Sequence, residues 1–384
     1  MVARAPANCG LREKRTLDPY LDARHAMEIC NACRYCEGFC AVFPAVTRRR
    51  EFSDGDLNYL ANLCHNCRAC FYSCPYVPPH EFGINVPQVF SEIRLRSYET
   101  YCFPAILGKA FRSNGMVVAV AAALGAVVAL SLASTLIDLN AISRPVLLPG
   151  DFYAIVPYRW MLTLGIATCI LSIIAMVVGA TRFWKDTAGS RRMSRAAIVE
   201  GLFDALSLKN LGSARNRGCN DRSERYSNAR RRFHHAMFYG FALCFASTCV
   251  ATAYDHFLGL QAPYALLSVP VQLGLWGGIG MVIGTSGLIW LKGTGEPEPS
   301  TPATRGPDYA LLLLLAAIAV SGLSLLALRA SSLVGLLLVI HLALVFTFFL
   351  MIPYSKMIHG LYRLLALVQS AAEHRDSLKA VAEG

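Results

Sequence analysis

Eight cysteines between residues 30 and 74 form two runs with the same spacing. The runs are Cys30-x-x-Cys33-x-x-Cys36-x-x-x-Cys40 and Cys64-x-x-Cys67-x-x-Cys70-x-x-x-Cys74. Three closely spaced thiolates can bind one face of a [4Fe–4S] cubane, while the fourth cysteine of each run binds the other cluster. The spacing therefore predicts two adjacent clusters, one on Cys30, Cys33, Cys36 and Cys74 and the other on Cys64, Cys67, Cys70 and Cys40.

Zinc is the alternative occupant of such a pattern, since it also binds Cys-x-x-Cys pairs. Two triads, each followed by a fourth cysteine, fit the four-ligand sites of zinc poorly. The first run departs from the ferredoxin pattern in one respect, because Ala41 and not proline follows Cys40. We therefore expect an altered turn after the first run and the same eight ligands.

Histidines in apolar segments are the second group of residues with chemical potential, because ionisable side chains inside a membrane are rare and usually functional. At 1.5 Å per residue, His235 and His256 are separated by about 31 Å along one helix, and His341 and His359 by about 27 Å along another. If the two helices pack antiparallel, His235 meets His359 and His256 meets His341. Each pair could supply the axial ligands of a b-type haem, so the pattern predicts one or two haems.

Two other interpretations of these histidines stay open. His234 could replace its neighbour His235 as the ligand. A histidine at a helix end, such as His234, His256 or His359, can also simply meet lipid headgroups. His341 is the hardest to explain in that way, because LLLVIHLALVF surrounds it with apolar residues.

Six apolar stretches would position these histidines, each long enough to cross a bilayer core with about 20 helical residues. They lie near 116–137, 160–180, 236–257, 267–291, 309–328 and 332–352. The chain is 55% hydrophobic and only 16% charged, as expected for a membrane protein. Glycines in GLWGGIGMVIGTSG (274–287) predict close packing of the fourth stretch against a neighbouring helix.

Positive charge sets the expected orientation. The net charge is +11, and much of it lies between Arg182 and Arg232, in the loop 181–235 between the second and third stretches. Loops rich in lysine and arginine stay in the cytoplasm, so both termini and the cysteine runs are predicted on that side of the inner membrane. This location argues against nucleic acid as the partner. The N-terminus shows no apolar signal segment, and cytoplasmic cysteines are more often metal ligands than disulfides.

The cysteine runs themselves are expected on helices. Between them, DGDLNYLANL leads into Cys64 with Leu57, Leu60 and Ala61 on one face, and Asp54 or Asp56 could cap this helix. We therefore predict an all-α protein with a helical, ferredoxin-like domain for two [4Fe–4S] clusters over residues 1–110. A six-helix membrane domain would follow over residues 111–384, with 292–308 as an exposed linker and 138–159 along the outer membrane interface.

The two cysteine segments also resemble a known family. ICNACRYCEGFCAVFPA (29–45) and REFSDGDLNYLANLCHNCRACFYSCPYVPPHEFGINVPQ (50–88) are similar to the tricarballylate/citrate utilisation protein B family, and the resemblance extends over the membrane part. It implies a role in reoxidising the flavin of a separate FAD-dependent dehydrogenase that oxidises tricarballylate. Electrons would then pass through iron–sulfur clusters and haem to membrane quinone. The membrane half is similar in plan to the haem-b subunit of respiratory nitrate reductases.

These observations favour an electron carrier that positions redox centres over an enzyme with acid–base or nucleophilic chemistry of its own. A haem-free iron–sulfur quinone reductase is the first alternative. A transporter or redox sensor that carries clusters is the second, although transporters usually have discontinuous helices with polar residues at mid-membrane. For the quinone site, both the aromatic loop with Phe152, Tyr153, Tyr158 and Trp160 and the basic cytoplasmic face stay open.

Overall fold

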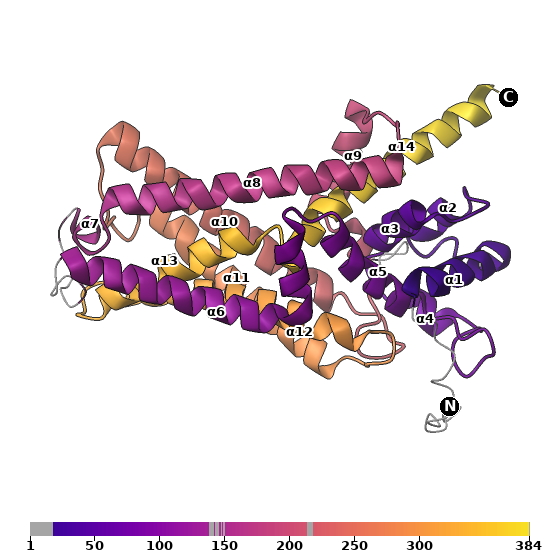
Figure 1. The fold of residues 1–384 in the computed structure, drawn as a ribbon, viewed down its shortest axis with the longest axis horizontal. Coiled ribbons are helices and arrows are strands. Elements are labelled where there is room, and N and C mark those ends of the chain that lie inside the picture. The colour runs from indigo at the N-terminus through magenta and orange to yellow at the C-terminus, as the bar shows by residue number, and fades with distance from the viewer. Residues whose placement is uncertain are drawn as a thin grey trace.

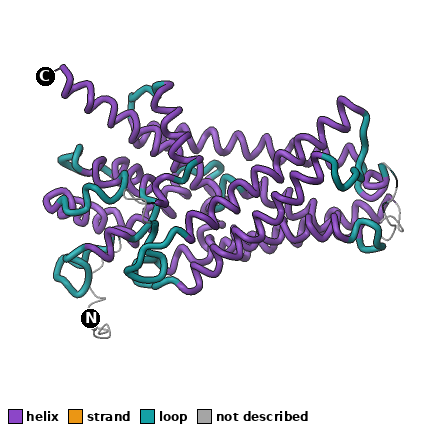
Figure 2. The backbone as a smooth tube through the Cα atoms, turned by 180° about the vertical axis from the view of Figure 1, so that it is seen from behind, coloured by secondary structure: helices purple, strands orange, loops and turns teal. Residues whose placement is uncertain are grey.

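The structure is a computed structural model that describes residues 18–137, 142, 146, 148, 150–212 and 218–383. A bundle of long helices occupies one end of the molecule, and shorter helices carrying the cysteine runs occupy the other (Figure 1). Seen from behind, both parts consist of helices joined by loops (Figure 2). In the described residues the only extended pairing is an isolated bridge between Cys219 and Ser227. The predicted all-α class is confirmed.

Five helices build the part that carries the cysteines. They are α1 (Pro19–Cys33), α2 (Val42–Val46), α3 (Asp54–Leu63), α4 (Ala69–Ser73) and α5 (Val86–Thr100). The predicted helix before Cys64 is α3, but its cap differs from the prediction. Ser53 is the N-cap and accepts a hydrogen bond from the Asp56 N–H, while the Asp56 carboxylate accepts one from the Ser53 N–H. This reciprocal capping box satisfies two backbone donors, whereas a single aspartate cap would satisfy one.

Six long helices form the bundle. They are α6 (Ala105–Ile137), α8 (Tyr158–Ala188), α10 (Ala229–Leu258), α11 (Val269–Thr294), α12 (Arg305–Ala327) and α13 (Val334–Met351). In the described part of the chain, these are the helices long and apolar enough to cross a membrane, which confirms the six predicted stretches. Several begin or end in polar residues beyond the apolar run, and α6 kinks at Asn114. The predicted outer loop contains the short helix α7 (Asp151–Ile155), while 138–141, 143–145, 147 and 149 lie outside the described residues.

Glycines bring α10 and α11 into close contact, as the sequence predicted. A Cβ on Gly240 would lie 2.7 Å from Gly277 O, and one on Gly277 would lie 2.8 Å from Cys244 N. Only glycine permits this approach, because any side chain there would separate the two backbones. The glycines therefore fix the rotation of α10 and, with it, the direction in which its histidines point.

The two long polar loops cover the second cysteine run. The basic loop forms α9 (Arg195–Leu206) and η3 (Lys209–Gly212), and Asn220 N then donates to Cys67 O over 2.9 Å. The linker 292–308 is not simply exposed as predicted. It includes η4 (Pro302–Thr304), and Arg68 donates to Glu296 O over 3.2 Å and to Ser300 Oγ over 2.7 Å. The composition of this segment is typical of exposed linkers. Its hydrogen bonds with Arg68 explain why it is partly buried instead.

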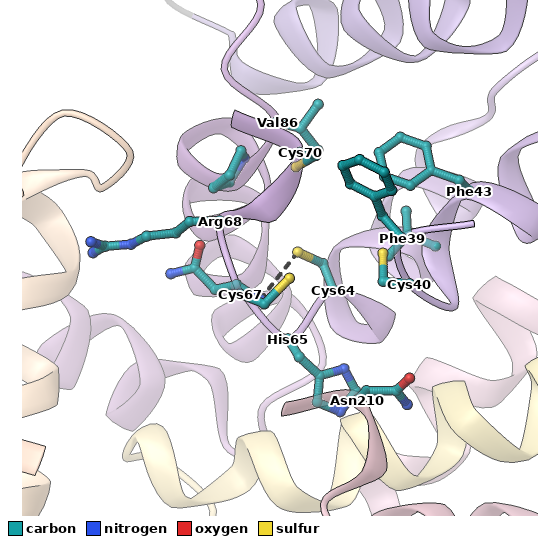
Figure 3. Close-up of a pocket in the computed structure, with 13 residues that line it drawn as sticks. Phe39, Cys40, Phe43, Cys64, His65, Cys67, Arg68, Cys70, Val86 and Asn210 are labelled. Carbon is teal, nitrogen blue, oxygen red and sulfur yellow. Dashed lines mark hydrogen bonds between the residues drawn. The ribbon is translucent and has the colours of Figure 1, made fainter. Parts of the chain in front are cut away.

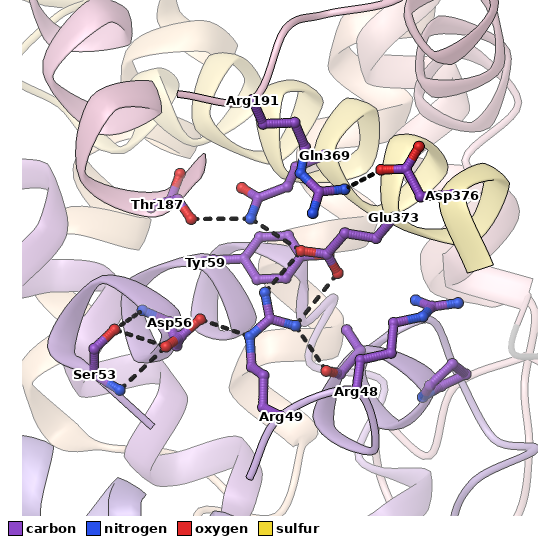
Figure 4. Close-up of polar contacts among 12 residues, drawn as sticks. Arg48, Arg49, Ser53, Asp56, Tyr59, Thr187, Arg191, Gln369, Glu373 and Asp376 are labelled. Atoms are coloured by element: carbon purple, nitrogen blue, oxygen red, sulfur yellow. Dashed lines mark hydrogen bonds and ion pairs between the residues drawn. The ribbon is translucent and has the colours of Figure 1, made fainter. Parts of the chain in front are cut away.

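The C-terminal helix α14 (His359–Glu383) packs against the cysteine-bearing part (Figure 1). Glu373 accepts hydrogen bonds from Arg49 over 2.7 and 3.3 Å, and Arg49 also donates to Asp56 over 2.6 Å (Figure 4). Tyr59 OH donates to Glu373 as well, over 3.3 Å. Tyr362 and other apolar residues of α14 belong to the same buried core as α1, α3 and α5. The two ends of the chain therefore share one core.

A buried ion pair closes the bundle near the start of α14. Asp308 of α12 pairs with Lys292 of α11 and with Lys356, which lies in η5 (Lys356–Ile358). Burial lowers the pKa of Lys356 to about 8, although the Asp308 carboxylate acts in the opposite direction and raises it.

A close contact also joins the end of α8 to α3. A side chain on Gly55 would overlap the Asp186 carbonyl.

Candidate electron-transfer site

The four thiols of the second predicted cluster surround one small cavity. Cys40, Cys64, Cys67 and Cys70 all line it, and Figure 3 shows them around it. Burial raises the pKa of the Cys70 thiol well above its usual value, and the thiols of Cys67, Cys40 and Cys64 raise it further. These thiols are therefore close enough to repel one another if they ionised. The cysteine from the first run joins three from the second, as the cross-ligation pattern requires.

The thiols of the first predicted cluster form a separate group. Burial raises the pKa of Cys30 to about 12, and the thiols of Cys36, Cys74 and Cys33 add to that shift. Cys36 also contributes to the raised pKa of Cys70, so the two groups are neighbours. Here too, the fourth cysteine comes from the other run.

No group of three or more His, Cys, Asp or Glu side chains in the described residues is arranged to hold a single metal ion. A cubane binds each thiolate to a different iron, so its four sulfurs lie farther apart than the ligands of one zinc ion. This finding therefore concerns single-ion sites.

The turns within the two runs are alike. Arg34 follows Cys33 with φ 54°, and Arg68 follows Cys67 with φ 64°, so equivalent arginines adopt the left-handed conformation that is uncommon outside glycine. In the second run Asn66 is also left-handed, with φ 53°, and its N–H donates to Cys64 Sγ over 3.4 Å. Hydrogen bonds to ligand sulfurs are one way in which proteins set the potential of a cluster. The left-handed residues turn the chain around the space that the thiols enclose.

The two groups differ in exposure. Cys33 of the first group is exposed and its three partners are partly buried, whereas Cys64 and Cys67 of the second group are buried. Arg230, at the start of α10, donates to Asn66 O over 2.7 Å. Arg363 of α14 donates to Cys64 O over 3.2 Å. The second group therefore lies between the exposed first group and the helix bundle.

Two histidines meet at this end of the bundle. The ring centres of His234 on α10 and His359 on α14 lie 6.5 Å apart. The Nδ1 of His359 donates to Lys356 O, which leaves its Nε2 free as an acceptor, and burial lowers the pKa of His359 well below its usual value. His234 Nδ1 is buried without a hydrogen-bond partner. His235, the predicted partner of His359, instead packs against Tyr239 with ring centres 5.7 Å apart.

The other two predicted histidines have different neighbours from each other. His256 lies against Tyr158 of α8, whose hydroxyl is 2.8 Å from its Nε2. His341 faces Ser321 of α12, with 3.0 Å between Nδ1 and Oγ. No contact joins these two histidines in the described part of the chain.

Basic side chains occupy the space between the second thiol group and the His234–His359 pair. Arg230 precedes His234 by four residues and Arg363 follows His359 by four, so each arginine lies on the same helix face as its histidine. His65, between Cys64 and Cys67, has its pKa lowered by burial and then by Arg363 and other arginines. Arg363 and Arg230 thus add positive charge beside the second thiol group, and Asp221 balances part of it through its ion pair with Arg230 over 3.5 Å.

Comparison with known proteins identifies the family. The family described as citrate utilization protein B matches residues 113–380, and its Fer4-like domain matches residues 23–100. The chain is 43% identical to the citrate utilization protein B of Escherichia coli over 376 residues, which cover 97% of this chain and 98% of that protein. The chain belongs to the citrate utilization protein B family. No solved structure matches it.

The site of this family member includes residues that are not among the candidates named from the sequence. His65 and Arg363 are two of them. The sequence does contain a pattern that indicates Arg363. It follows His359 by four residues, which places both side chains on one face of a helix. For His65 no comparable signal exists, because its burial depends on α14 folding back over the second cysteine run.

Proposed function

We propose that this protein carries electrons from a reduced flavoprotein, through two [4Fe–4S] clusters and one b-type haem, to membrane quinone. Residues 1–110 would form the cluster-bearing part, and residues 111–384 the membrane part. The observation that supports this order best is the gradient of burial. A thiol group with one exposed member, a thiol group with two buried members and a half-buried histidine pair follow one another toward the bundle.

The eight cysteines fit two cubanes in both number and arrangement. We propose Cys30, Cys33, Cys36 and Cys74 for the first cluster, and Cys40, Cys64, Cys67 and Cys70 for the second. Burial raises the pKa of most of these thiols, so they would stay protonated without a metal. Binding to iron is what would ionise them, because coordination deprotonates a thiol outright.

The histidine pair fits a metal held between two imidazoles. Metal–nitrogen bonds of ~2 Å would place the two ring centres about 6.4 Å apart. The ring centres of His234 and His359 lie 6.5 Å apart, with the ring planes at 79° to each other. The Lys356 carbonyl holds His359 in the tautomer that offers Nε2, as accepting backbone groups commonly do for metal-binding histidines. We therefore propose His234 in place of His235 as the ligand opposite His359.

The clusters and the haem would supply one-electron uptake and release, at potentials set by ligands, hydrogen bonds and burial. The residues around them do the rest. Arg363 links the backbone of Cys64 to the helix that carries His359, so the second thiol group and the histidine pair keep a fixed separation. Arg363, Arg230 and Arg94 place positive charge where a cluster would carry negative charge.

The donor would reach the exposed Cys33 side of the molecule, on the cytoplasmic face of the inner membrane. The resemblance implies a separate FAD-dependent dehydrogenase of tricarballylate, and the matched family is named for the utilisation of citrate, which is also a tricarboxylate. The acceptor would be quinone dissolved in the bilayer. The alternative is a haem-free route, in which the clusters pass electrons directly to quinone. The visible spectrum described next distinguishes the two routes.

The test is a reduced-minus-oxidised visible spectrum of purified protein, with His234→Ala and its matched control His235→Ala. We expect a sharp b-type α-band in the wild type, its loss in His234→Ala and its retention in His235→Ala. An iron–sulfur bleach without any α-band in fully reconstituted wild-type protein would support the haem-free alternative. Loss of the band in His235→Ala alone would return the ligand to His235.

A further inference from the structure

A second cavity lies within the bundle, away from the cysteines and the His234–His359 pair. Its volume is about 290 Å³, near the lower end of the range for small-molecule pockets, and parts of α10, α11, α12 and α13 line it. Its wall is mostly apolar and aromatic, including Phe241 and Phe348, whose ring centres are 5.4 Å apart. An apolar ligand of moderate size fits such a wall.

One polar atom of the wall is available to a ligand. The hydroxyls of Ser247, Thr248 and Tyr264 all donate to backbone carbonyls. His341 differs, because its Nδ1 lies 3.0 Å from Ser321 Oγ and no hydrogen bond to its Nε2 is found in the described part of the chain. Because His341 lines the cavity, a ligand bound there could satisfy this nitrogen.

Hydrogen bonding around Ser321 fixes the role of that atom. The Ser321 hydroxyl donates to Ile318 O over 3.0 Å. Since its single proton is used there, Ser321 Oγ accepts from His341 Nδ1–H, and His341 Nε2 carries a lone pair. In this tautomer, a ligand that bonds to Nε2 presents a hydrogen-bond donor to it.

The cavity opens on the lipid-facing side of the bundle. Phe245 and Thr248 line it and are also exposed on α10. Its inner wall includes Phe241, which follows His234 by seven residues, or about 10 Å along the helix axis. A ligand that enters from the bilayer would therefore lie close to the proposed histidine pair.

We propose that this cavity binds the head group of a membrane quinone, with His341 Nε2 accepting the hydrogen bond of a hydroxyl of the reduced form, the quinol. The inference rests on the proposed function, which supplies the electrons, and assigns its acceptor site. A b-type haem with two imidazoles is the rival occupant. The wall offers one histidine, and His256, its predicted partner, lies against Tyr158 instead.

The first experiment compares Thr248→Phe, at the mouth of the cavity, with Cys249→Phe, the next residue of α10, which is exposed and does not line it. Photoreduced protein is mixed with decylubiquinone, which takes two electrons from the protein and two protons from water to form the quinol. We expect the half-saturating quinone concentration to rise about tenfold in Thr248→Phe and to stay unchanged in Cys249→Phe. Equal behaviour of the two variants would overturn the site and leave the proposed function intact.

The second experiment tests His341 with unaltered access to the cavity. His341→Leu removes the acceptor, whereas His341→Gln retains one in its amide oxygen. We expect the half-inhibitory concentration of decylubiquinol to rise about tenfold in His341→Leu and less than threefold in His341→Gln. Loss of a haem α-band in both variants would assign the cavity to haem and overturn the proposal. Wild-type protein that no quinone reoxidises would overturn this inference and the proposed function together.

Discussion

Replacing Arg49 should loosen the contact between the cysteine-bearing part and α14. The Arg49 guanidinium lies between Glu373 and Asp56, and it stacks 4.8 Å above the Tyr59 ring (Figure 4). The side chains of Arg49 and Glu373 are only 12% and 7% exposed, so solvent screens the pair little. Although burial alone would lower it, these carboxylates hold the pKa of Arg49 above its usual value.

The cost of Arg49→Met follows from what it leaves behind. Glu373 would remain buried with only Tyr59 and Gln369 as donors, and removing one partner of a buried ion pair costs about 3–5 kcal/mol. Glu373→Gln should cost less, about 1–2 kcal/mol, because Arg49 keeps Asp56 and a neutral acceptor remains. The order of these two effects is as informative as their size.

Hydrogen exchange of the amides of α3 measures this cost where it acts. A loss of about 3 kcal/mol in the opening free energy speeds exchange roughly 150-fold. Arg48→Met is the matched control, since Arg48 is exposed and its hydrogen bonds to α14 go to the exposed side of that helix, at Ser377 and His374. Its effect should stay below about threefold, as for most surface substitutions. If α3 exchanges equally fast in Arg49→Met and Arg48→Met, the buried ion pair does not hold the two parts together.

Three further predictions concern the clusters, the pH dependence and the packing. Electron paramagnetic resonance of reduced protein should lose the same cluster signal in Cys40→Ser as in Cys67→Ser, whereas ligands of one run on one cluster would give different losses. Because the pKa of Lys356 is lowered to about 8, the unfolded chain binds more protons above that pH and stability should rise between about pH 8 and 10. Lys356→Met should flatten that rise in the midpoint of urea unfolding. Gly55→Ala should cost about 1–3 kcal/mol in the same assay, and Gly306→Ala, which has open space around it, should be nearly neutral.

The arrangement of the thiols was accessible from the sequence because it depends on local spacing. Three cysteines within seven residues can enclose one cluster face, and repeating the motif 34 residues later adds the second. The six membrane helices were accessible for a similar reason, since each is a long apolar run of its own. Both features need only short stretches of chain to be recognised.

Which of His234 and His235 faces His359 could not be predicted in that way. The side chains of successive residues in a helix point about 100° apart. The sequence therefore tells that His234 and His235 point in different directions, but it does not tell which of them faces α14. The contact of Gly240 with Gly277 sets the rotation of α10 and turns His234 toward His359. The loop contacts could not be predicted either. Both loops have a polar composition typical of exposed segments, and nothing in that composition indicates their hydrogen bonds with Arg68.

α14 connects the proposed cofactor sites to one another. Its first residue is His359, its fifth is Arg363 on the backbone of Cys64, and its fifteenth is Glu373 on Arg49. One rigid helix thus spans the histidine pair, the buried thiol group and the helices that carry the cysteines. A displacement of α14 would change the separation of the second thiol group from the histidine pair without altering any thiol. The Arg49–Glu373 pair is therefore expected to affect electron transfer as well as stability, although it lies away from every proposed ligand.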